Sequence, residues 1–207
     1  MTATISSLGD RARVSSPGPV RDLRAATEAA AAMMRALGID PDDPRNPDLA
    51  RTPQRLALAY ADLLTPVDFD MTTFDNVEEY DEMVIVRDIP MQSVCEHHLL
   101  PFVGRAHVAY LPAARIVGLS KLARVVAHYA SAPQTQERLT TQIASALDEH
   151  LRPRGVGVVI EAEHTCMTLR GAKAPGATTT TSSLRGLVKE NASSRAEFLA
   201  LVGRGER

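Results

Sequence analysis

The stretch MVIVRDIPMQSVCEHHLLPFVGRAHVAYL, Met83–Leu111, decides the fold class of this chain. Its two ends, Met83–Ile89 and Val103–Leu111, are short, rich in β-branched residues and bounded by Pro or Gly, which predicts two strands. Between them lies the segment CEHHLLPF, in which Pro101 suits a bend of the chain. A strand pair with a histidine-rich connection is therefore the starting point for the rest of the chain.

Helical and extended segments alternate after this pair. Helical periodicity returns over Ser120–Ser131 and Gln134–Leu151, and Gly155–His164 predicts another strand. The following CMTLR and TTTTSSL segments have β propensity, and a final helix is expected to begin at Ser194, which has capping-box spacing to Glu197. This order predicts an α+β domain with an antiparallel sheet.

The N-terminal part is predicted to be helical after a tail. Residues 1–19 are rich in Ser, Gly, Pro and Arg and are expected to form a disordered tail. Residues 20–66 contain two helix-forming runs that end near a Gly and a Pro, residues 67–80 are expected to form a loop, and residues 80–203 form the α+β core. Without an internal repeat or a clear linker, residues 20–203 are expected to form a single domain.

The composition is typical of a soluble globular protein. The 207 residues are 44% hydrophobic and 23% charged, with a formal net charge of -2. The longest apolar candidate, around Val117–Ala132, is interrupted by Lys121, Arg124 and His128, so no membrane partner is expected. A near-neutral charge argues against a general nucleic-acid binder, and the lack of an apolar signal core suggests a cytoplasmic location by default.

Thiol and imidazole side chains gather in two short segments. Cys95 and His98 are three residues apart, and His164 and Cys166 are two apart. In a reducing compartment the two cysteines are buried thiols, reactive thiols or metal ligands, and thiolate with imidazole favours zinc over magnesium or calcium. Cys95 and His98 share one metal only if the chain turns between them, whereas His164 and Cys166 are expected to share a strand face. A polar surface cluster is the alternative.

Basic side chains near helix starts are candidates for binding an anion. Lys121 and Arg124 lie in the first turns of a helix that Ser120 is expected to cap, where cations oppose the helix dipole and a bound phosphate would offset them. Arg55 and Arg170 are further candidates. A solvated basic face remains the alternative.

An acidic residue, Glu137, begins the second amphipathic helix. It is either a solvated first-turn residue favoured by the dipole or a carboxylate that accepts two N–H bonds from a guanine edge. A zinc nucleoside deaminase also combines Cys, His and Glu, but its Pro-Cys-x-x-Cys segment is absent from this sequence.

Taken together, these segments resemble the GTP cyclohydrolase I family. CEHH, GLSKLAR, QERLT and HxCMxxRG occur in series, and the matching stretches cover Leu23 to Val202. The resemblance implies a tunnelling fold, in which two helices pack on an antiparallel sheet preceded by a helical N-terminal part. It also implies a homodecamer built from two pentameric rings.

The resemblance further implies a zinc site and a reaction. The implied zinc ligands are Cys95, His98 and Cys166, and the implied acid–base residues are His97 and His164. The implied reaction is zinc-dependent hydrolysis of GTP, which opens the imidazole ring, releases formate and yields 7,8-dihydroneopterin triphosphate for tetrahydrofolate or pterin biosynthesis.

The implied substrate-binding residues include a guanine anchor, Glu137, and a cationic grip on the triphosphate. The full set is Glu137, Gln136, Ser120, Lys121, Arg124, Arg170 and Arg55. Because the family's sites lie between subunits, these residues need not converge within one chain. Two alternatives stay open: a paralogue with the same reaction that feeds 7-deazapurine or specialised metabolism, and a non-catalytic tunnelling-fold binding protein.

Overall fold

The computed structural model describes residues 10–15 and 20–203. The chain divides into two compact units, one of Met1–Ser16 with Pro66–Arg207 and one of Pro17–Thr65. The Pro17–Thr65 unit ends one residue before the end of the predicted helical N-terminal part, residues 20–66. The sequence prediction, in contrast, treats residues 20–203 as a single domain.

The Pro17–Thr65 unit is a pair of helices, α1 (Leu23–Ala36) and α2 (Thr52–Leu63), with the short 3-10 helix η1 (Pro47–Arg51) before α2. Asp22 caps α1, because its carboxylate accepts the backbone N–H of Ala25 at 2.9 Å. The apolar contact between the helices buries small side chains and one long one: Ala30, Met34 and Ala57.

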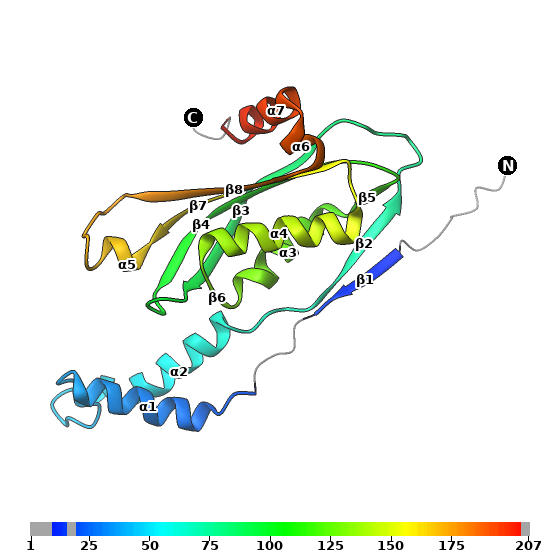
Figure 1. Cartoon of the computed structure of the whole chain (residues 1–207). Coiled ribbons are helices and arrows are strands. Elements are labelled where there is room, and N and C mark those ends of the chain that lie inside the picture. The colour runs from blue at the N-terminus through cyan, green and yellow to red at the C-terminus, as the bar shows by residue number, and fades with distance from the viewer. Residues whose placement is uncertain (1–9, 16–19, 204–207) are drawn as a thin grey trace. The chain divides into compact units, whose positions relative to one another are not determined.

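The larger unit is built on a five-stranded sheet (Figure 1). Its strands are β3 (Val84–Cys95), β4 (Pro101–Leu111), β6 (Pro133–Gln134), β7 (Gly155–His164) and β8 (Thr178–Arg185), in the order β6-β3-β4-β7-β8. The four long strands pair antiparallel, as the sequence predicts, and β6 pairs parallel with β3.

Helices α3 (Leu119–Ala130) and α4 (Gln136–Leu151) pack on one face of this sheet (Figure 1). The shared core contains fully buried side chains from both helices and from β4: Val108, Tyr110, Leu122, Val126, Leu139, Ile143 and Leu147. The predicted cap of α3 is wrong, because Gly118 occupies the N-cap position and Ser120 lies inside the helix.

The other face of the sheet is covered at one end by α6 (Gly186–Glu190) and α7 (Ala192–Gly203). Val188 and Phe198 pack there against the β4 side chains that alternate with those of the first core. The predicted start of the last helix at Ser194 is also wrong, because α7 begins at Ala192 and the side chain of Asn191 accepts the N–H of Ser194 at 3.0 Å.

A second sheet contains three strands that the sequence does not predict. These are β1 (Asp10–Val14), β2 (Phe69–Asp75) and β5 (Arg115–Val117), paired antiparallel in the order β1-β2-β5. β1 lies in the segment expected to be a disordered tail, and β2 in the segment expected to be a loop. Only alternate residues of β2 are buried, so its local sequence remains polar although Phe69 and Met71 join the core. The rest of the predicted tail, residues 1–9 and 16–19, lies outside the described residues.

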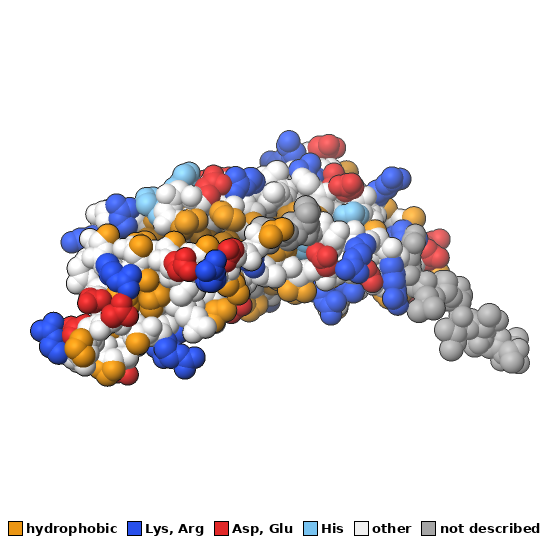
Figure 2. Space-filling model, turned by 90° about the horizontal axis from the view of Figure 1, so that it is seen from below, with side chains coloured by type: hydrophobic (Ala, Val, Ile, Leu, Met, Phe, Trp, Pro, Cys, Tyr) orange, Lys and Arg blue, Asp and Glu red, His pale blue; other side chains and the backbone are white. Residues whose placement is uncertain are grey.

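The surface carries charges of both signs. On the face in Figure 2, Lys and Arg side chains are interspersed with Asp and Glu side chains, and hydrophobic side chains lie between them. None of the described helices combines the length and apolar character that a bilayer span requires.

Candidate metal centre

The segment Cys95–His98, here called the metal turn, reverses the chain between β3 and β4. The N–H of Leu99 donates to the backbone O of Cys95 at 2.8 Å, and Leu99 adopts a positive φ of 53°. The reversal brings Cys95 Sγ within 3.9 Å of His98 Nδ1. The turn that the sequence requires for a shared metal is therefore present.

Cys166 reaches the same place from the other side of β4. Strand β7 ends at His164, and Cys166 lies in the short helix α5 (Thr165–Thr168), at the same end of the sheet as the metal turn (Figure 1). The prediction that His164 and Cys166 share a strand face is wrong, because the strand ends between them. Thr165 holds α5 in place by donating its hydroxyl to the backbone O of Pro101 at 2.6 Å.

The three predicted ligands form one cluster whose donor atoms all lie within 4.8 Å of one another. The sulfurs of Cys95 and Cys166 are 4.0 Å apart, too far for a disulfide. Tetrahedral zinc with Zn–S bonds of about 2.3 Å requires a sulfur–sulfur separation of about 3.8 Å. The two thiols and the imidazole of His98 therefore fit zinc, and three protein ligands leave a fourth position for water or substrate.

Burial and a neighbouring thiol act on Cys166 in the same direction. Burial raises the pKa of the Cys166 thiol above its ordinary value, Cys95 adds to the increase, and the positive charge of Arg170 partly offsets it. A bound cation would favour the thiolate form instead. The exposed Arg170, which follows α5, is thus close enough to act electrostatically on the cluster.

His97 and His164 flank the cluster in different environments. His97 is exposed on the metal turn, with Nδ1 3.9 Å from Cys95 Sγ. His164 is half-buried and stacks on Phe102 with ring centroids 4.4 Å apart and an interplanar angle of 4°. Burial lowers the pKa of the His164 imidazole, and the Glu137 carboxylate partly opposes that change.

Gln136 determines which nitrogen of His164 carries a proton. Its Nε2 donates to the backbone oxygens of Ile160 and Thr179 at 3.0 and 2.8 Å and lies 3.1 Å from Thr181 Oγ1. Because carbonyl oxygens only accept, the amide oxygen must face His164 Nε2, 2.8 Å away. Nε2 of His164 is therefore a donor, which leaves Nδ1 as the nitrogen that can exchange a proton.

The sequence contains no local signal for Phe102 or Thr181 as parts of this site. Phe102 lies directly opposite His164 in the β4–β7 register, and Thr181 lies opposite Ile160 in the β7–β8 register. Their positions follow from strand pairing between distant segments, and the register could have identified them.

The predicted substrate-binding residues on α3 lie away from the cluster within one chain. Ser120, Lys121 and Arg124 are on the first turns of α3, whereas the last turn of α3 lies nearer the metal turn, since Ala130 O accepts the hydroxyl of Ser93 at 2.7 Å. The helical rise places Lys121 about 13 Å along the axis from Ala130. Arg55 is exposed on α2, in the other unit.

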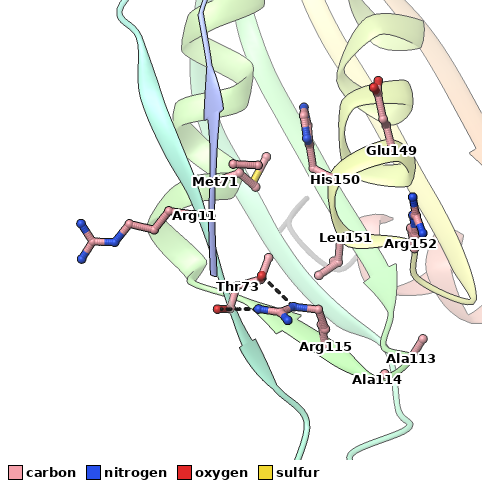
Figure 3. A pocket seen from close by; sticks show the side chains of 11 residues that line it. Arg11, Met71, Thr73, Ala113, Ala114, Arg115, Glu149, His150, Leu151 and Arg152 are labelled. Carbon is pink, nitrogen blue, oxygen red and sulfur yellow. Dashed lines mark hydrogen bonds between the residues drawn. The ribbon is translucent and has the colours of Figure 1, made fainter. Parts of the chain in front are cut away.

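Of two cavities in the larger unit, one is lined by a predicted site residue, Glu137, and the other, among the residues that the structure describes, is not. A groove of about 510 Å³ runs along α4 and is lined by Glu137, Thr135 and Thr141 among others. The cavity in Figure 3, of about 470 Å³, lies between β2 and the end of α4. Arg115 there donates to Thr73 Oγ1 at 2.9 Å, and Arg11 points away from the cavity. No predicted site residue is among the described residues that line it.

Comparison with known proteins gives consistent matches. The sequence profile of the GTP cyclohydrolase I family matches residues 26–203. GTP cyclohydrolase 1 of Carboxydothermus hydrogenoformans is 51% identical over 175 residues, covering 83% of this chain and 90% of the relative. GTP cyclohydrolase 1 of Mycobacteroides abscessus is 52% identical over 194 residues, covering 90% and 93%.

Among solved structures, the apo form of archaeosine synthase QueF-Like aligns with a TM-score of 0.42 and 15% identity, over 50% of this chain and 93% of that chain. That similarity is too low to add to the argument. The profile match and the identity above 50% confirm the resemblance that the sequence motifs indicate, and with it the tunnelling fold of two helices on an antiparallel sheet. The chain belongs to the GTP cyclohydrolase I family.

Proposed function

We propose that this protein hydrolyses GTP, releases C8 as formate and forms 7,8-dihydroneopterin triphosphate, the first step of tetrahydrofolate or related pterin biosynthesis. The observation that carries the proposal is the cluster of Cys95, His98 and Cys166 beside an oriented imidazole, His164. The relatives are named as enzymes, which favours a catalyst over a non-catalytic binding protein.

Cys95, His98 and Cys166 would hold zinc, since their donor types and separations suit a tetrahedral site with one open position. When bound, zinc supplies Lewis-acid chemistry that makes water a nucleophile at neutral pH. The protein holds C8 of guanine beside this site, and its side chains donate and accept the protons of the reaction.

His164 is the proton donor to N7 of guanine in this proposal. Gln136 holds Nε2 of His164, so the proton passes through Nδ1, and protonation of N7 makes C8 more electrophilic. His97, exposed on the metal turn, transfers protons in the later ribose steps. Partial burial lowers the pKa of the His164 imidazole, and a lowered pKa favours release of the proton.

Glu137 anchors the guanine edge, and its position in the groove along α4 supports this role. Gln136 lies next to this anchor in the chain, but its amide is engaged with protein groups, so its contribution to substrate binding is indirect. Lys121, Arg124, Arg170 and Arg55 form the cationic grip on the triphosphate, and Ser120 is a further residue that contacts the substrate.

A homodecamer of two pentameric rings would supply the grip residues from more than one chain. The separation of Lys121 from the metal turn within one chain supports a shared site. Strand β8 is an edge of the described sheet, and pairing between chains would cover such an edge. The cytoplasm is the proposed location, since it keeps Cys95 and Cys166 reduced.

The direct test incubates purified protein of known zinc content with GTP and measures formate together with the fluorescence of oxidised neopterin. The proposal expects equal amounts of formate and pterin. Protein that contains zinc at full occupancy and releases no formate would exclude the catalytic function.

Replacing His164 by Ala is expected to retain zinc and to reduce kcat by about 10²–10⁴-fold, because an imidazole that transfers a proton is lost while the three ligands remain. Zinc analysis and formate release measure the two effects. His150→Ala, near the end of α4, is the control and should behave like the wild type. A His164→Ala protein with wild-type turnover would contradict the assignment.

Replacing Glu137 by Gln is expected to lower kcat/KM for GTP by about 10–100-fold, since a charged hydrogen bond contributes roughly 1.5–3 kcal/mol. The ratio of GTP to ATP turnover should fall with it. Asp148→Asn, which changes an exposed carboxylate on the same helix that is not among the described residues lining the groove along α4, is the matched control. Unchanged discrimination between GTP and ATP would count against a guanine anchor.

A further inference from the structure

Arg138, in the first turn of α4, joins this helix to the metal turn. Its Nη2 donates to Oε2 of Glu96 and, at 2.7 Å, to the backbone O of Pro133, while its Nε donates to Oε1 of Gln134 at 2.9 Å. One planar guanidinium therefore contacts three acceptors at once. A lysine ammonium is a point charge and cannot reproduce this fork.

Gln134 supplies a rigid base for the guanidinium. Its side chain is buried, and Nε2 donates to Tyr129 O and Gln142 Oε1, both at 2.8 Å, which turns Oε1 toward Arg138. The backbone of Gln134 pairs with that of Cys95, and its carbonyl accepts the N–H of Glu96 in the metal turn at 3.0 Å. The anchor of Arg138 is thus itself attached to the metal turn.

The position of Arg138 is electrostatically unfavourable unless an anion faces it. A cation in the first turn opposes the helix dipole, and Glu96 supplies the opposite charge. The side chains of Arg138 and Glu96 are 43% and 32% exposed, so the pair contributes little to overall stability. Oε1 of Glu96 also lies 4.0 Å from Nε2 of His97. The pair therefore matters for the position of the metal turn rather than for the stability of the fold.

We propose that Arg138 is a positioning residue that, with Glu96, holds the metal turn against the first turn of α4. Three consecutive residues then have three tasks: Gln136 orients the half-buried imidazole of His164, Glu137 anchors guanine, and Arg138 fixes the turn that carries two metal ligands. This inference rests on the proposed function for its catalytic consequence, but its effect on metal binding is independent of turnover.

The test compares the full-length wild type with Arg138→Met, Arg138→Lys, Glu96→Gln and the double variant Glu96→Gln/Arg138→Met. Cobalt(II) in place of zinc reports the ligand geometry through its visible spectrum. For Arg138→Met, the expected results are a Co²⁺ affinity and a kcat each lower by about 10–100-fold. KM for GTP should change by less than about threefold, and Tm by less than about 4 °C. Arg138→Lys should recover only part of the loss.

The double variant tests whether Arg138 and Glu96 act as one unit, here called the clamp, or independently of each other. If Arg138 acts through Glu96, adding Glu96→Gln to Arg138→Met should cost little more than the single change. Additive effects, or a folded Arg138→Met protein with wild-type Co²⁺ affinity and kcat, would overturn the inference. A lowered Tm with an unchanged Co²⁺ spectrum and affinity would show a merely structural role and also overturn it.

Arg105→Met provides a control, because Arg105 on β4 also pairs with an acidic side chain, Asp88 on β3, at 3.0 Å and is also exposed to solvent. Its Co²⁺ spectrum, Co²⁺ affinity and kcat should equal those of the wild type. If the wild type releases no formate from GTP, the proposed function fails, and the Co²⁺ measurements still decide whether the clamp exists.

Discussion

Replacing Cys166 by Ser is expected to abolish zinc binding and ring opening together. Cys166 supplies one of two sulfurs in the three-residue cluster, 4.0 Å from Cys95 Sγ, and a serine hydroxyl does not replace a thiolate as a zinc ligand. Loss of the metal removes several kcal/mol of transition-state stabilisation, so kcat/KM should fall by at least about 10³-fold. Zinc analysis and formate release measure both losses.

The control for this variant is Met167→Leu, which changes an exposed neighbour of Cys166 on the same short helix. It should retain zinc and activity. Stoichiometric zinc and full turnover in Cys166→Ser would refute the ligand assignment. Zinc loss with retained turnover would refute the metal dependence of the reaction instead.

Replacing Gly104 by Ala is expected to destabilise the sheet strongly. Gly104 lies on β4 opposite Ala162 of β7, and a Cβ there would be 1.9 Å from the backbone O of Glu161 and 2.6 Å from Ala162 Cα. These atoms belong to the backbone of the neighbouring strand and cannot move aside cheaply, so we expect a loss of about 3 kcal/mol or more. Thermal unfolding should show a Tm lower by at least about 6 °C.

The effect of Gly104→Ala should extend to the site, because Phe102, two residues earlier on β4, stacks on His164 across the same strand pair. Gly203→Ala is the control, since an added Cβ at Gly203 meets no atom of the described residues within 4 Å. A Tm equal to that of the wild type in Gly104→Ala would show that β4 and β7 separate more easily than the register suggests.

Segments with strong local periodicity were predictable. Helix α4 follows from its regularly spaced leucines and Ile143, and β7 has the predicted bounds, Gly155–His164. The thiol and imidazole spacing indicated the two segments that the structure brings together, and the family resemblance implied which three residues in them are the ligands. The turn that these ligands require is present. In these cases the pattern within one short segment carries the information.

The missed strands and the misread CMTLR segment share a cause in contacts between distant segments. β1 and β2 pair residues that lie 55 to 63 positions apart in the chain. β2 buries only alternate side chains, and Val14 is the one buried side chain among those described in β1, so neither strand is recognisable from its own sequence. The β propensity of CMTLR is overridden where Thr165 bonds to Pro101 and the chain turns into α5.

By itself, the sequence determined the main helices, the long strands of the five-stranded sheet, the family and the types of the candidate ligands, two cysteines and His98. Only the tertiary structure decided that Gln136 orients His164, that Phe102 covers that ring and that Arg138 reaches Glu96. The physical reason is that periodicity and motif spacing are local. Hydrogen-bond direction, ring stacking and charge pairing depend instead on strand register and helix packing, which bring together residues far apart in the chain.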